Sequence, residues 1–408
     1  MNILYLNLYD ELGGAEKICN LLYYQFSQGD KHYRFVLAGN RSSDKNSYSL
    51  FSQHEFKKVE EYLIKYDILK KIVRILALIC IVRIILVKRI DVVHLHNTHD
   101  YLISCRGIKV LLKFVPVVWT LHDMWAMTGH CAYSAKCVNW KDGCRECRNL
   151  SAYPALVNNL TEKIFLQKKA LFTENHLYRV CPSEWLYNMI KDSGIGAKNL
   201  FRIPNGVDLG TFRRIDKKTA RRKLHLSENK KYLLFVAASV NNKKKGMNYL
   251  LDAVKMINDV KDLEILVMGN TNHKISGSGI PVHRLGYISD EKVLNEIYAA
   301  ADLFILPSIE DNFPCTTLEA MASGTPVIAF KVGGIIEQLD EESGFLADEI
   351  LSNELAMKIR MALSDQEKLD NISEKAYRRS VHLFSAAGMN DKYRVLYKRA
   401  LKKYRRFK

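Results

Sequence analysis

The chain has 408 residues, of which 48% are hydrophobic and 26% are charged, and this composition argues against a disordered chain. A chain of this length normally forms two domains of ordinary size, each with its own core. The formal net charge of +17 favours an anionic partner, which leaves nucleotide sugars, nucleic acids and acidic membrane surfaces as candidates.

The first residues and the cysteines bear on cellular location. Met1 leads directly into an apolar run at 3–8, without the basic and apolar regions of a secretory signal. The nine cysteines are an odd number, and several lie in apolar runs, which favours reduced thiols over a disulfide framework. We therefore expect a cytoplasmic protein.

Apolar runs recur along the chain, with helical patterns between them. Continuous rather than alternating runs predict parallel strands that are covered by helices on both faces. Pro204, Asn205 and Gly206 mark a turn between the two halves. We therefore predict an α/β protein with domains at 1–203 and 204–384. The expected strands are 3–8, 33–38, 92–95, 117–121 and 179–181, then 232–237, 263–268, 303–306 and 327–330.

A Gly-Gly pair follows the first expected strand. Gly13 and Gly14 allow a close approach of the backbone just before a helix that begins near Ala15. A plain tight turn would use the same residues, but ligands of open α/β sheets bind at the carboxyl ends of the strands. We therefore favour a ligand-binding loop.

The segment 69–91 is strongly apolar, yet it contains Arg74 and Arg83. Its longest uncharged run, Ile75 to Val82, is far shorter than the roughly 20 residues needed to span a bilayer. A basic apolar helix suits a membrane interface with anionic headgroups; a buried helix is the alternative. The tail 392–408, which is basic, free of acids and apolar at helical spacing, supports the membrane interpretation.

Histidines follow two of the expected strands. His94, His96 and His99 lie at and beyond the strand at 92–95, where they could contact an acceptor, pack in the core or face solvent. His122 follows the strand at 117–121. A lone histidine is more often structural than catalytic, so spacing alone assigns no role.

A cysteine cluster follows His122. The spacing C-x5-C-x6-C-x2-C can wrap a tetrahedral thiolate site, and zinc is its natural occupant in a reducing compartment. Free thiols in a loop or a redox pair are the alternatives. The expected ligands of this structural zinc are Cys131, Cys137, Cys144 and Cys147.

The segment 301–330 carries the strongest functional signal. It predicts a buried strand, a loop that opens at Pro307 and a helix that begins near Pro314. The unpaired N–H groups of a helix N-terminus can hold a phosphate, and adjacent carboxylates can accept hydrogen bonds from sugar hydroxyls. This predicts a site for a sugar joined to a nucleotide diphosphate, the alternative being an ordinary strand–loop–helix unit with solvated acids. The predicted residues are Cys315, Thr316 and Thr317 for the phosphate and Asp311 and Glu319 for the sugar and nucleoside.

The same segment resembles the signature of the family 4 retaining glycosyltransferases, E-x7-E followed by AMA-x-G-x-P-V-I-A. The resemblance implies the GT-B fold, in which two Rossmann-like domains face each other across a cleft, with 385–408 packing back on the first domain. The first family Glu falls on Asp311, with Glu310 one position earlier. The resemblance implies a sugar contact for Asp311, which Glu310 could supply instead after a loop shift, and a ribose contact for Glu319.

The resemblance also implies roles at strand ends outside this segment. Gly13 and Gly14 would face the donor phosphates and the acceptor. His122 would lie near the transferred sugar. Gly286 and Tyr287 would hold the nucleotide base through backbone groups.

A basic cluster completes the expected donor site. The family places a Lys directly before a Gly, to neutralise the diphosphate, and this chain has Lys245 there. The Arg that the family usually has a few residues earlier is missing. Lys243 or Lys244 could supply its charge.

We therefore expect a retaining glycosyltransferase of surface polysaccharide biosynthesis, with His122, Asp311 and Glu319 as its catalytic residues. It would move a hexose from a nucleoside diphosphate sugar to a lipid-linked glycan acceptor. We expect it to work at the inner face of the cytoplasmic membrane and to need no cofactor for catalysis. The alternatives are a GT-B epimerase or phosphorylase and a non-catalytic binding partner. Nucleic-acid binding is least favoured, because the basic residues accompany apolar faces rather than aromatic stacking platforms.

Overall fold

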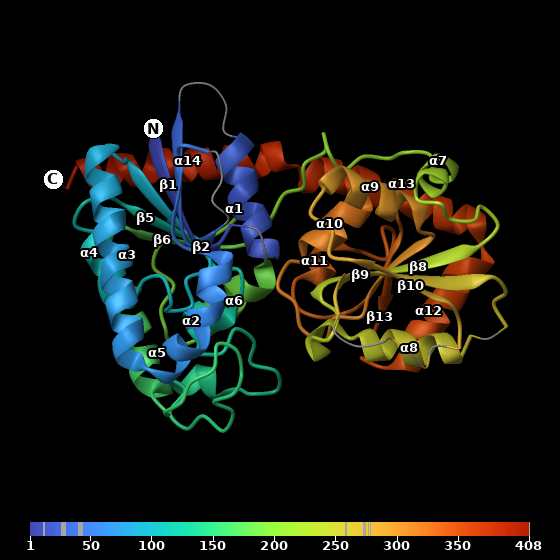
Figure 1. Cartoon of the computed structure of the whole chain (residues 1–408), viewed down its shortest axis with the longest axis horizontal. Coiled ribbons are helices and arrows are strands. Elements are labelled where there is room, and N and C mark those ends of the chain that lie inside the picture. Colours follow the sequence, from blue (N-terminus) through green and yellow to red (C-terminus); the bar gives the residue numbers. More distant parts are fainter. Residues whose placement is uncertain are drawn as a thin grey trace. The chain divides into compact units, whose positions relative to one another are not determined.

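The computed structural model describes residues 1–10, 13–25, 30–39, 44–257, 259–271, 275, 277 and 279–407. The chain divides into two compact units, one formed by Met1–Pro204 with Asn390–Lys408 and the other by Asn205–Met389. Each unit has a parallel sheet flanked by helices (Figure 1). The predicted α/β class with two Rossmann-like domains is therefore confirmed.

In the described part of the first unit, the sheet has seven parallel strands in the order β3-β2-β1-β4-β5-β6-β7. The strand order reverses between β1 and β4. The strands are β1 (Asn2–Tyr9), β2 (Lys31–Gly39), β3 (Ser47–Ser52), β4 (Val92–Leu95), β5 (Val117–Thr120), β6 (Leu177–Cys181) and β7 (Leu200–Arg202). The helices include α1 (Gly14–Gln25), α2 (Gln53–Lys65), α3 (Asp67–Val87), α4 (Cys105–Leu111), α5 (Thr161–Leu171) and α6 (Glu184–Asp192).

In the described part of the second unit, the sheet has six parallel strands in the order β10-β9-β8-β11-β12-β13. Here the order reverses between β8 and β11. The strands are β8 (Lys231–Ser239), β9 (Leu263–Asn270), β10 (Val282–Gly286), β11 (Leu303–Leu306), β12 (Val327–Phe330) and β13 (Phe345–Ala347). The helices include α7 (Lys217–Lys223), α8 (Met247–Lys255), α9 (Glu291–Ala300), α10 (Cys315–Ala322), α11 (Ile335–Gln338), α12 (Ser352–Ser364) and α13 (Gln366–Leu383), and α14 (Ala386–Arg405) begins in this unit.

The central strands are buried on both faces. In β11 and β12, Phe304 and Val327 pack into the core on one side of the sheet, whereas Ile305 and Ile328 pack into the core on the other. Successive strand residues point to opposite faces, so a sheet with two covered faces needs apolar residues throughout. The strands β3, β7, β10 and β13 were missing from the sequence prediction because they are short or partly exposed and lack such runs.

Helix α3 is buried along one stripe only. Val73, Ala77, Ile81 and Ile85, spaced four residues apart, pack into the core of the first unit. Among the described residues, no helix is both long enough and apolar enough to cross a membrane. On the opposite side of α3, several large apolar side chains have 48% to 73% of their surface exposed: Ile68, Ile72, Ile75, Leu76, Ile79, Leu86 and Val87.

The position of Arg74 corrects the sequence interpretation of this helix, which gave Arg74 to a membrane surface. Arg74 Nη1 lies 2.5 Å from Asp100 Oδ2, and Lys70 Nζ lies 3.8 Å from the same oxygen. Both basic side chains are mostly buried. They hold α3 to the loop after β4, and Arg83 is a more exposed cation of this helix.

Helix α14 packs on the first unit through its aromatic face. The Tyr397 hydroxyl lies 2.6 Å from His94 Nδ1, and the Tyr393 hydroxyl lies 2.6 Å from Thr120 Oγ1. His94 is fully buried, so it belongs to the core rather than to an acceptor site. Most apolar side chains of the basic tail therefore face the protein, whereas Val395, Phe407 and most of its cations are exposed; Lys408 lies beyond the described residues.

Candidate functional site

Two loops of the second unit meet where its strand order reverses. β8 lies between β9 and β11, and loops on the two sides of such a switch point part to leave a crevice at the carboxyl edge of the sheet. Lys245 ends a helical turn after β8, Lys243–Lys245, and Asp311 lies in the loop after β11. Lys245 Nζ lies 2.6 Å from Asp311 Oδ2. The fold thus joins two predicted donor-site residues.

Two glycines fix the position of this ion pair. A Cβ atom on Gly246 would lie 1.8 Å from the carbonyl oxygen of Pro307, and a Cβ atom on Gly333 would lie 1.8 Å from the carbonyl oxygen of Asp311. Both glycines also have positive φ angles, 75° and 52°. Any other residue at either position would displace the loop that carries Lys245 or Asp311.

A second ion pair lies beside the first. Lys244 Nζ lies 2.9 Å from Glu310 Oε2, without the orientation of a hydrogen bond. The sequence interpretation offered Lys243 or Lys244 as a substitute for the missing family Arg, and Glu310 as a substitute sugar ligand. The structure pairs Lys244 with Glu310, so their charges offset each other, and it leaves Lys243 exposed.

Glu319 is a buried carboxylate in the middle of α10. The Tyr298 hydroxyl, on α9, donates a hydrogen bond to Glu319 Oε2 at 2.9 Å. Burial and the neighbouring carboxylate raise the pKa of Tyr298 well above 10.0, so this hydroxyl keeps its proton. Sequence reasoning missed Tyr298, because an apolar helix position carries no local signal of a polar partner on another helix.

The N-terminus of α10 faces the loop that carries Asp311. Its N-cap residue is Pro314, whose side chain cannot accept a hydrogen bond from the first turn. Cys315 and Thr317 are buried there and Thr316 is partly exposed. The Thr317 hydroxyl has no hydrogen-bond partner among the described residues. A phosphate would supply acceptors for the N–H groups that a helix N-terminus leaves without a partner inside the helix.

The predicted base-binding residues lie toward one edge of the same sheet. Gly286 ends β10 with φ 73°, and Tyr287 follows it with 41% of its surface exposed. Two strands, β9 and β8, separate β10 from β11. The structure thus places Gly286 and Tyr287 at a carboxyl strand end, as the ion pair is, but apart from it, and their contact with a base stays a prediction.

The first unit has a polar group at its own switch point, between β1 and β4. Gly13 follows β1 with φ 110°, and Gly14 begins α1. The Glu16 side chain, one turn into α1, is buried. Burial raises the pKa of Glu16 to about 8, although Asn7 stabilises its charged form. A protonated carboxyl at this position can donate a hydrogen bond.

His122 forms a pair with His96 at the ends of β5 and β4. His96 Nδ1 lies 2.9 Å from His122 Nε2, so one ring donates a hydrogen bond to the other. Desolvation lowers the pKa of His122 to about 4 and also lowers the pKa of His96. Both rings are therefore neutral near pH 7. The sequence prediction singled out His122 but gave no sign of this pairing.

A second histidine contact lies next to the first. His99 Nε2 lies 2.8 Å from Asp123 Oδ2, and His99 Nδ1 lies 3.1 Å from the Tyr153 hydroxyl. Burial would raise the pKa of Asp123, but the contacts with His99, the Trp125 N–H and His122 together outweigh burial and lower this pKa. Sequence reasoning missed Asp123, although its position directly after His122 was a usable signal.

Two family models match the chain. One, described as Glycosyl transferases group 1, matches residues 216–379, and the other, described as Glycosyltransferase Family 4, matches residues 40–211. The chain belongs to the family 4 glycosyltransferases. One model matches part of each unit, so Lys245 and Asp311 of the second unit and the histidines of the first unit are matched by different models.

One relative of this family 4 glycosyltransferase is an Escherichia coli protein named as a glycosyl transferase of colanic acid biosynthesis. It is 26% identical over 268 residues, which cover 63% of this chain and 64% of the relative. The match therefore spans less than two thirds of that relative's length.

Solved structures share the GT-B fold. A sucrose-phosphate synthase from Thermosynechococcus elongatus has a TM-score of 0.73 at 16% identity, with 99% of this chain and 100% of that chain covered. The Anabaena protein HepE, in complex with UDP and glucose, has a TM-score of 0.70 at 18% identity, with 97% and 99% covered.

The four clustered cysteines of this family member lie in the loops between β5 and α5. The Gly129 N–H lies 3.1 Å from Cys144 Sγ, and His130 Nε2 lies 3.4 Å from Cys147 Sγ. Burial, together with smaller contributions from Cys131 and Cys137, raises the pKa of Cys144 to about 11. Among the described residues, no group of three or more His, Cys, Asp or Glu side chains is arranged to hold a metal ion.

Proposed function

We propose that the protein is a retaining glycosyltransferase of surface polysaccharide biosynthesis. It moves a hexose from a nucleoside diphosphate sugar to a glycan acceptor that is linked to a lipid. The observation that carries this proposal is the Lys245–Asp311 ion pair at the switch point of the second sheet, where Asp311 lies in the loop that leads to α10. Family membership and the colanic acid role in the name of one relative support it.

Donor binding would break the Lys245–Asp311 ion pair, and both side chains would then contact the donor. Its diphosphate takes the Lys245 ammonium and the N–H groups at the start of α10, which is the usual way a helix N-terminus binds phosphate. Asp311 then becomes available to accept a hydrogen bond from a sugar hydroxyl. Glu319, held by Tyr298, accepts hydrogen bonds from the ribose. The HepE structure, which has the same fold, contains UDP, and this is consistent with a nucleotide ligand for the proposed site.

The transfer step needs stabilisation of the departing diphosphate. As the bond between the sugar and the phosphate oxygen breaks, negative charge grows on the diphosphate, and Lys245 is positioned to offset it. The acceptor hydroxyl bonds to the sugar from the face that the diphosphate leaves, and its proton passes to the departing diphosphate oxygen. This retains the configuration without a protein nucleophile. In the first unit, His122 is the proposed sugar contact, and its neutral ring can exchange hydrogen bonds with a hydroxyl.

A lipid-linked acceptor requires access to a membrane surface. The exposed side of α3 presents several large apolar side chains in the described residues, among them Ile75, Leu76 and Ile79, while its buried stripe anchors the helix to the core. A helix of this kind lies in the interface rather than across the bilayer. We propose that the protein works peripherally at the inner face of the cytoplasmic membrane.

A structural zinc ion remains part of the proposal. His130 Nδ1 donates a hydrogen bond to the carbonyl oxygen of Pro154 at 2.9 Å, which turns Nε2 toward the Cys147 thiol. A backbone carbonyl that orients a ring in this way is typical of histidines that bind metals. Cys131, Cys137 and Cys144 lie in the same loops, which would have to shift to bring these thiols together as ligands.

Release of nucleoside diphosphate from a panel of nucleotide hexoses, with and without lipid-linked glycan, tests the enzymatic activity. We expect one donor to be turned over, with a product whose anomeric configuration, read by NMR, matches the donor. Lys245→Ala should remove the activity, whereas Lys255→Ala, which alters an exposed lysine of α8, should not. No turnover of any donor, or equal turnover by both variants, would refute the proposed role.

A further inference from the structure

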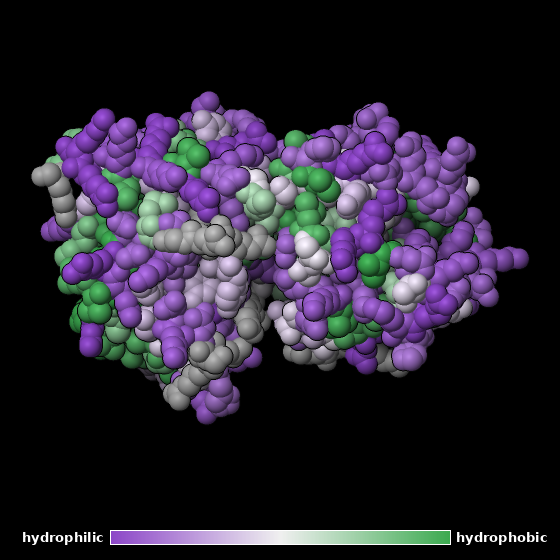
Figure 2. Space-filling model, turned by 90° about the horizontal axis from the view of Figure 1, so that it is seen from above, coloured by the Kyte–Doolittle hydropathy of each residue, from purple (hydrophilic) through white to green (hydrophobic). Residues whose placement is uncertain are grey.

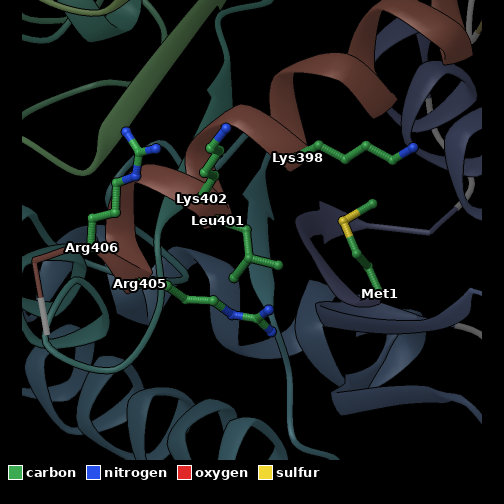
Figure 3. Close-up of a pocket in the computed structure, with 6 residues that line it drawn as sticks. All are labelled: Met1, Lys398, Leu401, Lys402, Arg405 and Arg406. Carbon is green, nitrogen blue, oxygen red and sulfur yellow. The ribbon is translucent and has the colours of Figure 1, made fainter.

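A basic pocket lies at the C-terminal end of α14. It has a volume of about 390 Å³ and is lined by Met1, Lys398, Leu401, Lys402, Arg405 and Arg406. Figure 3 shows these side chains projecting from the last turns of the helix and, for Met1, from the start of β1. Four of the lining residues are cations and none is an acid.

In the part of the chain that the structure describes, most of the cations that line the pocket have no acidic partner. Lys398 and Lys402 are four residues apart on α14, and Arg406 directly follows the last residue of this helix, so three like charges lie within a short stretch of the chain. Within the described residues, Arg405 alone of the four lining cations has an ion pair, with Asp91 at 3.1 Å. The helix dipole favours cations in the last turn, but Lys398 lies two turns from the end. An anionic ligand would relieve the repulsion among these like charges.

The pocket adjoins the exposed end of α3. Asn2 Nδ2 donates hydrogen bonds to the carbonyl oxygens of Lys88 and Arg89, and Asp91 accepts from both the Asn2 N–H and Arg405. The residues just before Lys88, Leu86 and Val87, are 60% and 66% exposed. Phe407, which follows α14, is 70% exposed.

Apolar and hydrophilic residues therefore alternate at this corner of the first unit. In Figure 1 the C-terminal end of α14 lies beside one end of α3. In Figure 2 green and purple side chains gather together at the left of the picture, the side where Figure 1 shows α3. This combination suits the boundary between lipid headgroups and acyl chains, where cations meet phosphates and apolar side chains enter the bilayer.

We propose that the pocket on α14 binds the phosphate of an anionic lipid headgroup and so fixes the orientation of the first unit on the membrane. Lys398, Lys402 and Arg406 contact the phosphate, and Leu86, Val87 and Phe407 enter the acyl region beside it. A nucleic acid would gain nothing from these exposed apolar side chains, so a lipid is the better fit. The inference rests on the proposed peripheral membrane association and adds the site that makes it selective for anionic lipid.

Vesicle sedimentation tests this site with the full chain. The ligand surfaces are phosphatidylcholine alone and phosphatidylcholine mixed with phosphatidylglycerol. We expect binding to the mixed vesicles and much less to the neutral ones. The triple variant Lys398→Gln, Lys402→Gln and Arg406→Gln should bind the mixed vesicles on the order of 100-fold more weakly, as expected for three lost cations at an anionic surface.

A charge-matched control separates the pocket from net charge. Lys255→Gln, Lys261→Gln and Lys292→Gln remove three exposed lysines from the second unit and should leave vesicle binding unchanged. Donor turnover without lipid should be the same in both triple variants and in the wild type, which also shows that they fold.

The outcomes distinguish this site from the broader proposal. Equal loss of vesicle binding in both triple variants would assign the binding to net charge and overturn the pocket. Wild-type binding that survives intact in the α14 variant would do the same, while leaving peripheral association in place. Absence of wild-type binding to any vesicle would overturn both. Calorimetric binding of inorganic phosphate at the pocket, with no preference for anionic vesicles, would replace the lipid by a soluble anion.

Discussion

Lys245 and Asp311 form an ion pair of 2.6 Å across the switch point of the second sheet, although they belong to loops that follow different strands. The pair holds a cation at the position where a diphosphate would bind and holds an acid beside it. In the proposed donor site, Lys245 and Asp311 are therefore already in place without a donor, and donor binding would replace Asp311 by the diphosphate as the partner of Lys245.

Asp311→Asn should separate nucleotide binding from transfer. The substitution removes the acid that competes with a diphosphate for Lys245, so a free nucleoside diphosphate should bind at least as tightly as to the wild type. Transfer should fall by roughly 10- to 100-fold, because the sugar loses a charged hydrogen-bond acceptor. Calorimetry with the nucleoside diphosphate and a transfer assay measure the two effects. Weaker nucleotide binding by Asp311→Asn would show that Asp311 does not compete with the diphosphate.

Glu319→Gln should mainly weaken donor binding, whereas Tyr298→Phe should mainly lower the stability of the protein. Glu319→Gln keeps the side-chain volume but removes the charge, and donor affinity should fall by about 1.5 to 3 kcal/mol. Tyr298→Phe keeps the carboxylate but leaves it buried with one donor fewer, so the main effect should be a loss of about 1 to 3 kcal/mol in stability. Donor titration and thermal melts of both variants check this. A Tyr298→Phe protein with wild-type stability would show that other groups satisfy Glu319.

Acid should destabilise the protein through the His96–His122 pair. Desolvation lowers the pKa of His122 from 6.5 to about 4, so the unfolded chain binds a proton that the folded chain does not. The stabilisation is complete above about pH 6.5 and is lost as the pH falls toward 4, by up to about 1.4 kcal/mol per pH unit for each histidine. Denaturant unfolding at several pH values measures this slope. His122→Asn should flatten it, and an unchanged slope would mean that other groups cause the acid sensitivity.

Glu16 should destabilise the protein as the pH rises, whereas the His96–His122 pair does so as the pH falls. Burial raises the pKa of Glu16 from 4.5 to about 8, so the folded chain retains a proton that the unfolded chain releases. The contribution of this carboxyl is complete below about pH 4.5 and is lost as the pH rises toward 8. Glu16→Gln cannot ionise, so its melting temperature should exceed that of the wild type above pH 8 and match it at pH 5. Equal melting temperatures across this range would contradict the raised pKa.

The cysteine loops should contain zinc. Protein purified without chelators should carry about one zinc ion per chain by elemental analysis. Cys147→Ser and His130→Ala should both reduce the zinc content, because the ring of His130 is turned toward the Cys147 thiol. Cys19→Ser, which alters a buried cysteine of α1, serves as the control. Metal-free wild-type protein with four reactive thiols in these loops would rule the site out.

Local sequence patterns predicted the central strands and several residues of the candidate site. Continuous apolar runs identified the central strands, and the E-x7-E-like segment with its helix start located Asp311, Glu319 and the turn at Cys315. A strand that is buried on both faces is apolar at nearly every position, so it is visible in a short stretch of sequence. A helix N-terminus is also visible locally, because its first residues follow directly after the cap residue. The family resemblance also assigned both Lys245 and Asp311 to the donor site.

Tertiary structure alone decided which partners these residues have. Tyr298 holds Glu319 from another helix, and Tyr397 buries His94 from 303 positions away, so neither contact leaves a pattern in the local sequence. Arg74, which the composition of its segment assigned to a membrane, instead pairs with Asp100. Sequence periodicity shows which side of a helix is apolar, but only packing determines which cations on that helix meet an acid and which stay exposed to solvent.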